Sequence, residues 1–218
     1  MCVLEEGARL TGFVATSFEE LLNRLPADAL VAIDIPIGLP DKGARICDQE
    51  ARRFLRAPRA SSVFAAPVRA ALRGETYADA CAAHFLADGR RMSKQAFAIL
   101  PKIKEVDGVL SQRPELQGRV REIHPEVCFA AWNAGRAMQH RKSRPAGRAE
   151  RESLIDAVWP GERERLRSEL RRFRCRADDL NDAFAALWSA RRIHEGAALL
   201  FPSTPELDRF GLRMEMLA

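Results

Sequence analysis

The sequence predicts an α/β domain built on a mixed sheet with flanking helices, and three segments carry that prediction. Residues 29–34 (ALVAID) are apolar, include two β-branched residues and show no polar alternation, which is typical of a strand buried on both faces. Residues 119–124 (RVREIH) alternate in polarity and are followed by Pro125, which indicates a second strand that ends there. Residues 177–195 carry apolar side chains at helical spacing and indicate a helix near the C-terminal end.

The composition is that of an ordinary globular protein. The chain has 218 residues, of which 47% are hydrophobic and 30% charged, enough for a sizeable core. Its net charge of +5 permits a polyanionic partner without requiring one. The five cysteines are scattered and form no C-x-x-C pair, so we expect neither a disulfide framework nor a zinc site.

These cysteines, and the absence of targeting signals, predict a reducing, cytoplasmic location. No apolar run approaches the roughly 18 residues of a membrane span. The first residues, MCVLEEGARL, are too acidic and too polar for a signal peptide. We therefore expect a protein that is neither exported nor membrane-spanning.

The segment before the first buried strand predicts a hairpin and a short helix. Residues 2–4 and 8–16 are strand-like and flank a short turn that contains a glycine. Ser17 then stands at a helix N-cap position, with Glu20 three residues later as a capping box. We expect this helix to cover residues 17–25 and to lead into the buried strand.

Asp34 closes the apolar strand. Pro36 cannot donate to a strand ladder and biases Ile35 toward an extended conformation, so the strand should end within a residue or two of Asp34. The carboxylate would then lie at the carboxyl end of a central strand, where open α/β sheets bind their ligands. The alternative is that Asp34 only caps the turn that follows it.

Residues 41–115 turn helical and are too long for a bare crossover, which predicts a helical insertion. Hydroxyls and cations lie in or beside its loops and helix starts, where they could hold phosphate oxygens. The alternative is that each belongs to a solvated helix face, as exposed charges usually do. The candidates for binding substrate in this region are Arg45, Arg52, Ser61, Ser62, Lys94, Gln95 and Lys102, with Arg59 and Arg69 in the same group.

The second strand repeats the arrangement seen at Asp34. Glu122 is a carboxylate near the carboxyl end of this strand, and Pro125 is well suited to be the first residue of the next helix. As a lone residue Glu122 could simply be a charge on an edge strand. His124 lies between Glu122 and Pro125, and it either takes part in chemistry or caps the helix.

Residues 136–151 are basic and lack apolar periodicity, so we expect an exposed loop that a polyanion could order. A flexible segment with several cations should contact phosphates without reading bases. The alternative is a solvated loop that binds nothing. Lys142 is the leading substrate-binding candidate of this segment, together with Arg144, Arg148 and Arg151.

The C-terminal helix is acidic on one face. Asp179 and Asp182 are three residues apart and therefore share a face with small residues that let a helix approach a sheet. Two carboxylates on a packed surface repel each other, so either that face is solvated or a cation neutralises the pair. Mg²⁺ or Mn²⁺ is the natural candidate, because the residues offer oxygens and no thiolates.

As a set, the two strand-end acids and the two helical acids are what two-metal phosphoryl chemistry needs. One ion would activate a water molecule, and the other would stabilise the leaving oxygen. The predicted catalytic and metal-binding residues are Asp34, Glu122, Asp179 and Asp182.

Several segments, in chain order, together resemble the family called domain of unknown function 429. That family is described as predicted RNase H-like nucleases, so the resemblance implies one RNase H-like domain over residues 1–218 and metal-dependent cleavage of nucleic acid. The D-x-x-D-A motif also resembles the last helix of RuvC-type Holliday junction resolvases, which implies that Asp179 and Asp182 bind metal and that Asp34 ends the fourth strand. The matching segments are VAIDIPIGLP, R-x-C-D-x-x-A-R at 45–52, SSVF at 61–64, P-K-I-x-E-V-D at 101–107, E-I-H-P-E at 122–126 and DDLNDA at 178–183.

In one respect the sequence departs from that family. Its members begin with a strand resembling G-V-D-G-C, whose aspartate the RNase H-like interpretation requires as a metal ligand. This sequence starts with MCVLEEG, which resembles the second strand. We therefore expect the sheet to be split between the hairpin and the strand at 29–34, and one ligand to be missing.

Three functions follow from these observations. The first is a metal-dependent nuclease, and the second is a catalytically silent module that binds nucleic acid or another partner. The third is a small-molecule phosphotransferase, since the same fold core serves sugar kinases and ATPases. Divalent-dependent cleavage would separate the nuclease from the silent module, and salt-dependent binding of nucleic acid would separate both from the phosphotransferase.

Overall fold

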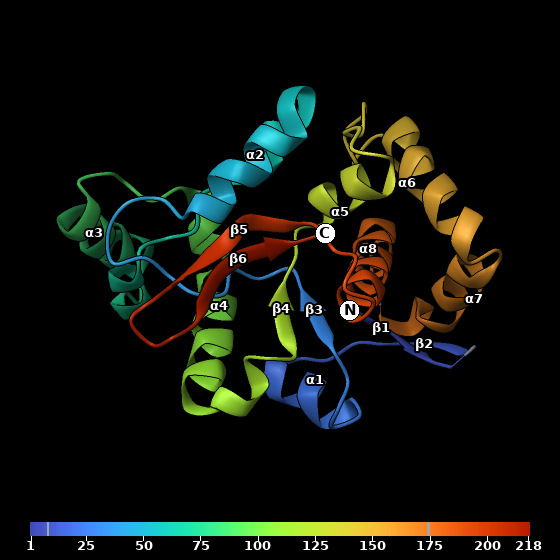
Figure 1. Ribbon diagram of the computed structural model, residues 1–218, viewed down its shortest axis with the longest axis horizontal. Helices are drawn as coiled ribbons and strands as arrows, with labels where there is room; N and C mark the ends of the chain where they lie inside the picture. Colours follow the sequence, from blue (N-terminus) through green and yellow to red (C-terminus); the bar gives the residue numbers. More distant parts are fainter. Residues whose placement is uncertain (8, 174) are drawn as a thin grey trace.

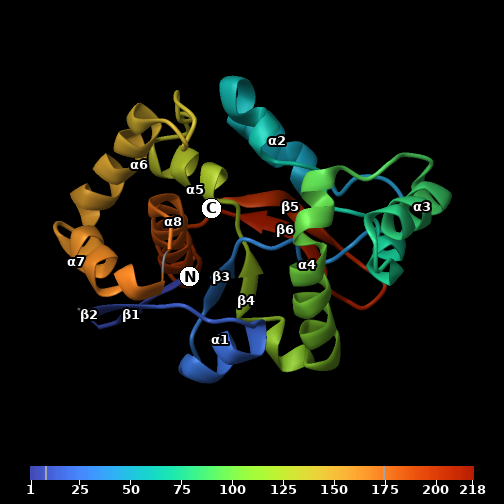
Figure 2. The same ribbon diagram turned by 180° about the vertical axis from the view of Figure 1, so that it is seen from behind.

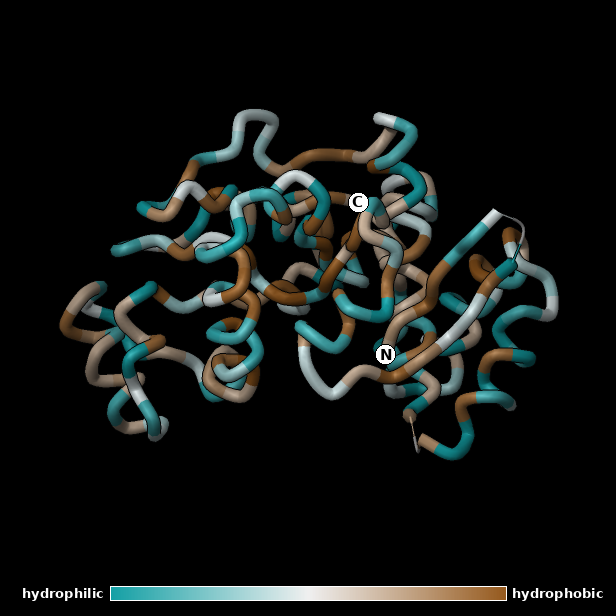
Figure 3. Tube along the Cα trace, turned by 90° about the horizontal axis from the view of Figure 1, so that it is seen from below, coloured by the Kyte–Doolittle hydropathy of each residue, from teal (hydrophilic) through white to brown (hydrophobic). Residues whose placement is uncertain are grey.

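The computed structural model describes residues 1–7, 9–173 and 175–218, and it shows a mixed α/β protein (Figure 1). The strands from Val31 onward lie in the middle of the molecule with helices around them, and the N-terminal hairpin lies at one side. Hydrophobic residues gather toward this middle, whereas the outer turns of the chain are largely hydrophilic (Figure 3). None of the helices in the described part of the chain is long and apolar enough to cross a membrane.

The chain begins with the predicted hairpin. Strands β1 (Cys2–Glu6) and β2 (Arg9–Phe13) pair antiparallel, and residue 8, at the predicted start of the second strand, lies outside the described residues. Helix α1 (Phe18–Arg24) follows, and the Ser17 hydroxyl accepts a hydrogen bond from the Glu20 N–H at 3.0 Å. The sequence prediction of this helix and of its N-cap is therefore confirmed.

The central strands are parallel and shorter than predicted. β3 (Val31–Ile33) pairs with β4 (Val120–Glu122). A parallel bridge between Ile123 and Leu217 then joins β4 to β6 (Arg213–Leu217), which is antiparallel to β5 (Leu200–Leu207). Parallel and antiparallel pairs thus lie side by side, as predicted for a mixed sheet.

The expected break in the sheet is present. Among the described residues the strands form three two-stranded sheets, and β1 does not pair with β3. A cavity of about 770 Å³ lies between them and is lined by both strands and by α8 (Ala177–His194). In the described part of the chain β3 pairs with β4 alone. Successive residues of a strand turn their N–H and C=O to opposite sides, so those of Ala32 face this cavity.

The predicted insertion is helical. It packs beside β4 and β6 and reaches the far side of the molecule from α8 (Figures 1 and 2). Its helices are α2 (Ile46–Arg59), α3 (Tyr77–Asp88) and α4 (Lys94–Gln112), with 3₁₀ turns η1 (Ala60–Ser62), η2 (Arg69–Arg73) and η3 (Pro114–Leu116).

The other helices cover the opposite side of the strands. In Figure 1, α6 and α7 form an arc outside α8, and both contact it. Phe184 of α8 is fully buried in the largest core cluster, and the Trp132 and Trp188 rings stack at 5.1 Å. These helices are α5 (Pro125–Trp132), α6 (Pro145–Val158), α7 (Glu162–Glu169) and α8, with the 3₁₀ turn η4 (Arg171–Phe173).

The prediction of one exposed loop over residues 136–151 is wrong. Helix α6 starts at Pro145, and Arg151 within it is buried against Glu126, with Nη2 2.6 Å and 2.7 Å from the two carboxylate oxygens. A buried cation looks like a surface residue in sequence, because its carboxylate partner comes from another helix. Arg151 is therefore unavailable to a phosphate.

Candidate functional site

Asp34 lies directly after β3, at the carboxyl end of the strand, as predicted. It lines both the cavity between β1 and β3 and a second pocket of about 520 Å³. Its side chain reaches solvent through these openings, but the surrounding protein removes part of its hydration and raises the pKa of the carboxyl. The charges of His124 and Lys142 act in the opposite direction.

Asp182 faces Asp34 from the second turn of α8. Its Oδ2 accepts a hydrogen bond from the Lys142 ammonium at 2.6 Å, while its Oδ1 is buried and has no partner among the described residues. Burial raises the pKa of Asp182 to about 6; Lys142 lowers it in part, and the charge of Asp34 raises it further. The structure thus brings Asp34 and Asp182 together.

Asp179 lies one turn earlier and lines the 770 Å³ cavity with them. One of its oxygens accepts a hydrogen bond from the Arg176 N–H at 2.9 Å. A first-turn carboxylate that binds a free backbone N–H stabilises the helix end without any ligand. This contact gives Asp179 a structural role, and metal binding by it stays a prediction.

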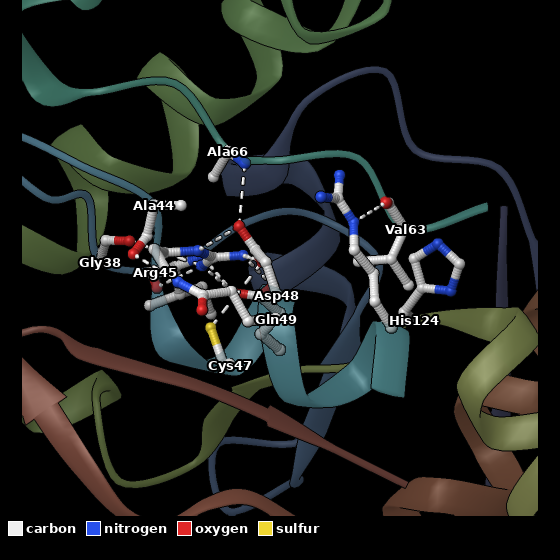
Figure 4. A network of polar contacts seen from close by, with 12 residues as sticks. Gly38, Ala44, Arg45, Cys47, Asp48, Gln49, Val63, Ala66 and His124 are labelled. Atoms are coloured by element: carbon white, nitrogen blue, oxygen red, sulfur yellow. Dashed lines mark hydrogen bonds and ion pairs between the residues drawn. The ribbon is translucent and has the colours of Figure 1, made fainter. Parts of the chain in front are cut away.

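Glu122 is held inside the protein by Arg45. The two Nη atoms of Arg45 lie 2.7 Å from the two carboxylate oxygens of Glu122, and the Ile37 N–H donates to one of them at 2.6 Å. Arg45 also donates to Asp48 at 2.6 Å, and Asp48 accepts from the Ala66 N–H at 2.9 Å (Figure 4). Both Arg45 and Glu122 therefore belong to an internal network at the floor of the 520 Å³ pocket.

The mouth of this pocket is basic. Arg59 lines it and donates to the carbonyls of Met138 and Gln139, both at 3.0 Å, so its charge meets only neutral acceptors there. Arg141 is exposed and has no carboxylate partner within the described chain. The other predicted substrate-binding residues that line this pocket are Ser61, Ser62, Gln95 and Lys142.

The remaining substrate-binding candidates lie elsewhere. Arg52 is half-buried and donates a hydrogen bond to the Val63 carbonyl at 2.6 Å. This contact holds the segment that carries Ser61 and Ser62. Lys94 is exposed at the start of α4, outside the pocket lining. Lys102 lines the larger cavity and donates to Glu105 at 3.1 Å.

His124 also lines the 520 Å³ pocket, beside the Val63 segment (Figure 4). Its Nε2 lies 3.2 Å from the Ser62 carbonyl, to which an Nε2–H can donate. Its Nδ1 is buried and has no partner in the described residues. The sequence left the role of His124 open. In the structure its side chain lines this pocket.

A metal ion would have few protein ligands here. Within the described ranges, no group of three or more His, Cys, Asp or Glu side chains is arranged to hold one. Asp34 and Asp182 nevertheless offer two carboxylates and one oxygen without a partner. Mg²⁺ is often held by one or two protein carboxylates, with water and substrate phosphates completing its coordination. The residues therefore fit one hard divalent ion.

Fold and site together define an α/β protein with a carboxylate pair beside a basic pocket, at the carboxyl ends of parallel strands. The chain belongs to the family described as protein of unknown function (DUF429), whose model matches residues 1–207. This confirms the family resemblance seen in the sequence. No curated protein and no solved structure is detectably similar to the chain.

Proposed function

We propose that this protein is a nuclease that hydrolyses phosphodiester bonds of nucleic acid with the help of Mg²⁺ or Mn²⁺, on an RNase H-like core. The observation that carries the proposal is the convergence of Asp34 and Asp182, the second of which has a buried oxygen without a partner among the described residues. Two carboxylates in such surroundings repel each other and lose hydration, and a bound cation removes both costs.

Each residue of the site has a role in this proposal. Asp34 and Asp182 would hold the ion, which supplies Lewis-acid activation of the phosphate and of a water molecule. Lys142 neutralises Asp182 in the protein without ligand, and its flexible ammonium can turn to a phosphate oxygen when substrate binds. Arg59 and Arg141 would hold the neighbouring phosphates of the strand.

The test is cleavage of labelled DNA and RNA oligonucleotides with Mg²⁺, with Mn²⁺ and with EDTA. We expect divalent-dependent cleavage that falls by more than about 10- to 100-fold in Asp34→Asn and Asp182→Asn, since even outer-shell changes at metal sites cost that much. Glu206→Gln is the matched control, because Glu206 is an exposed carboxylate on β5 outside both cavities. Cleavage that persists in EDTA or in Asp34→Asn would contradict the proposal.

A second readout does not depend on activity. Mn²⁺ should raise the thermal unfolding temperature of the unsubstituted protein and of Glu206→Gln, because a ligand that binds only the folded state stabilises it. The same addition should leave Asp182→Asn unchanged. Salt-dependent binding of nucleic acid without cleavage or a Mn²⁺ effect would instead favour the silent binding module.

A further inference from the structure

The 520 Å³ pocket lies at the carboxyl ends of β3 and β4 and contains Asp34 on its wall. Its other walls come from the segment after α2, from the start of α4 and from the segment before α6. Contacts within the protein hold these walls in place. Arg52 donates a hydrogen bond to the Val63 carbonyl. Asp48 accepts a hydrogen bond from the Ala66 N–H (Figure 4). The pocket is therefore a formed recess rather than a gap between mobile loops.

Some charged side chains of this pocket form ion pairs, and others do not. Its buried carboxylates at Asp48 and Glu122 are both paired with Arg45, and Glu126 is paired with Arg151. In contrast, Arg59 and Arg141 form no ion pair with any described carboxylate. These two arginines place positive charge at the mouth, apart from the buried carboxylates of the floor, and can attract an anionic group there.

Neutral donors lie among these cations. Ser61, Ser62 and Ser143 line the pocket, and their hydroxyls make no hydrogen bond to another described residue. Hydroxyls and arginines are common partners of phosphate oxygens in nucleic-acid complexes. Apolar side chains also line the pocket, among them Phe64 and Ile99, both half-buried. A base could pack against these side chains while its phosphate meets the donors.

The size of the recess limits what can enter. A volume of about 520 Å³ corresponds to a small-molecule site, which usually measures about 300–1,000 Å³. A nucleotide that stays paired and stacked inside a duplex cannot enter such a recess as a single unit. Enzymes that act in such recesses take single strands or extrude one nucleotide from a duplex.

We propose, on the basis of the nuclease function above, that this pocket holds one unpaired nucleotide unit and that the substrate is therefore single-stranded nucleic acid. The base packs against Phe64, and its phosphate lies between Arg141 and the serine hydroxyls. The adjacent phosphodiester bond then lies at Asp34 and Asp182. Water adds to phosphorus, the bond to the leaving sugar oxygen breaks, and that oxygen takes up the proton that water loses, directly or through solvent.

The binding test uses a labelled 12-nucleotide strand, alone and annealed to its complement, with the full chain in EDTA. Fluorescence anisotropy should show at least about tenfold tighter binding of the single strand. Arg141→Ser should weaken this binding about tenfold, as expected for one hydrogen bond to a charged group. The negative slope of log affinity against log salt should also become less steep by about 0.7, which is the contribution of one phosphate contact on a single strand.

Arg53→Ser is the matched control. Arg53 is an exposed arginine on α2, and it does not line the pocket. It should bind the single strand as the unsubstituted protein does. Equal losses in the two variants, or equal affinity for strand and duplex, would overturn the proposal.

Two further measurements separate this proposal from the nuclease proposal. If strand and duplex are cleaved equally fast with Mg²⁺, the substrate class is wrong while the nuclease function stands. If the single strand binds selectively but nothing is cleaved, the nuclease function fails while the assignment of the pocket stands. Adenosine monophosphate that binds as tightly as the oligonucleotide would overturn the strand assignment in favour of a nucleotide substrate.

Discussion

At the scale of single residues, Arg45 contributes most to the architecture around the site. It is buried and bonds two carboxylates, Asp48 and Glu122, together with the Ile37 carbonyl at 3.0 Å. Its partners come from the start of α2, from the end of β4 and from the turn after β3. The side chain therefore ties together the three segments that form the floor of the 520 Å³ pocket.

Replacing this cation should be costly. We expect Arg45→Met to lower the free energy of unfolding by about 3–5 kcal/mol, because two buried carboxylates lose their counter-charge. Urea unfolding followed by circular dichroism measures the change. Arg53→Met is the control, since Arg53 is exposed on the same helix and should change stability by less than about 0.5 kcal/mol. Similar stabilities of the two variants would contradict the structural role of Arg45.

Asp182 should make stability depend on pH. Its pKa in the folded protein is about 6, above the ordinary 3.8, so the folded state binds the proton more tightly than the unfolded state. The resulting stabilisation is complete below pH 3.8 and is lost as the pH rises through 6. In EDTA, Asp182→Asn should therefore gain up to about 3 kcal/mol relative to the unsubstituted protein between pH 4 and 7. Parallel pH profiles of the two proteins would disprove this.

At the scale of elements, helix α6 differs most from the sequence prediction. Residues 136–151 read as a basic loop, yet the chain becomes helical at Pro145 and packs Arg151 inward. Gly147 lies in the first turn of this helix, where a Cβ atom would stand only 2.1 Å from the Arg141 carbonyl oxygen. The close approach fixes the segment that carries Arg141 and Lys142 against α6.

Gly147→Ala should therefore destabilise the protein by about 1–3 kcal/mol or more, because a backbone atom cannot yield as a side chain would. The matched control is Gly108→Ala in α4, where a Cβ atom would meet nothing within 4 Å. There the same substitution should stabilise by about 0.5–1 kcal/mol, since alanine loses less backbone entropy in a helix. Equal effects in chemical denaturation would show that the segment moves freely away from α6.

At the scale of the whole molecule, the sheet is interrupted. Helix α8 packs against both β1 and β3, while the cavity separates the two strands. The hairpin is thus joined to the central strands through a helix rather than through backbone hydrogen bonds. An unpaired strand edge inside the molecule is open to solvent exchange.

Amide hydrogen exchange tests this break. The Val31 N–H donates to the Arg119 carbonyl at 2.7 Å, whereas the Ala32 N–H is on the edge that faces the cavity. We expect Ala32 to exchange at least about tenfold faster than Val31 in nuclear magnetic resonance measurements. Equal protection would mean that the edge of β3 is covered in solution.

The sequence by itself determined the features that depend on neighbouring residues. The apolar run and Pro36 defined β3 and placed Asp34 at its end, and helical spacing defined α8 with Asp182 on it. The position of Ser17 three residues before Glu20 predicted that Ser17 caps helix α1. Each of these depends on local periodicity or on backbone chemistry within a few residues, so the sequence is sufficient.

Only the tertiary structure decided which charges are free. Glu122 and Arg45 looked like a ligand and a substrate contact, but they neutralise each other across 77 positions of sequence. Arg151 looked exposed and pairs with Glu126, while Asp34 and Asp182 converge from a strand and a distant helix. A buried charge is stable only with a partner, and which partner it meets depends on long-range packing that no local pattern encodes.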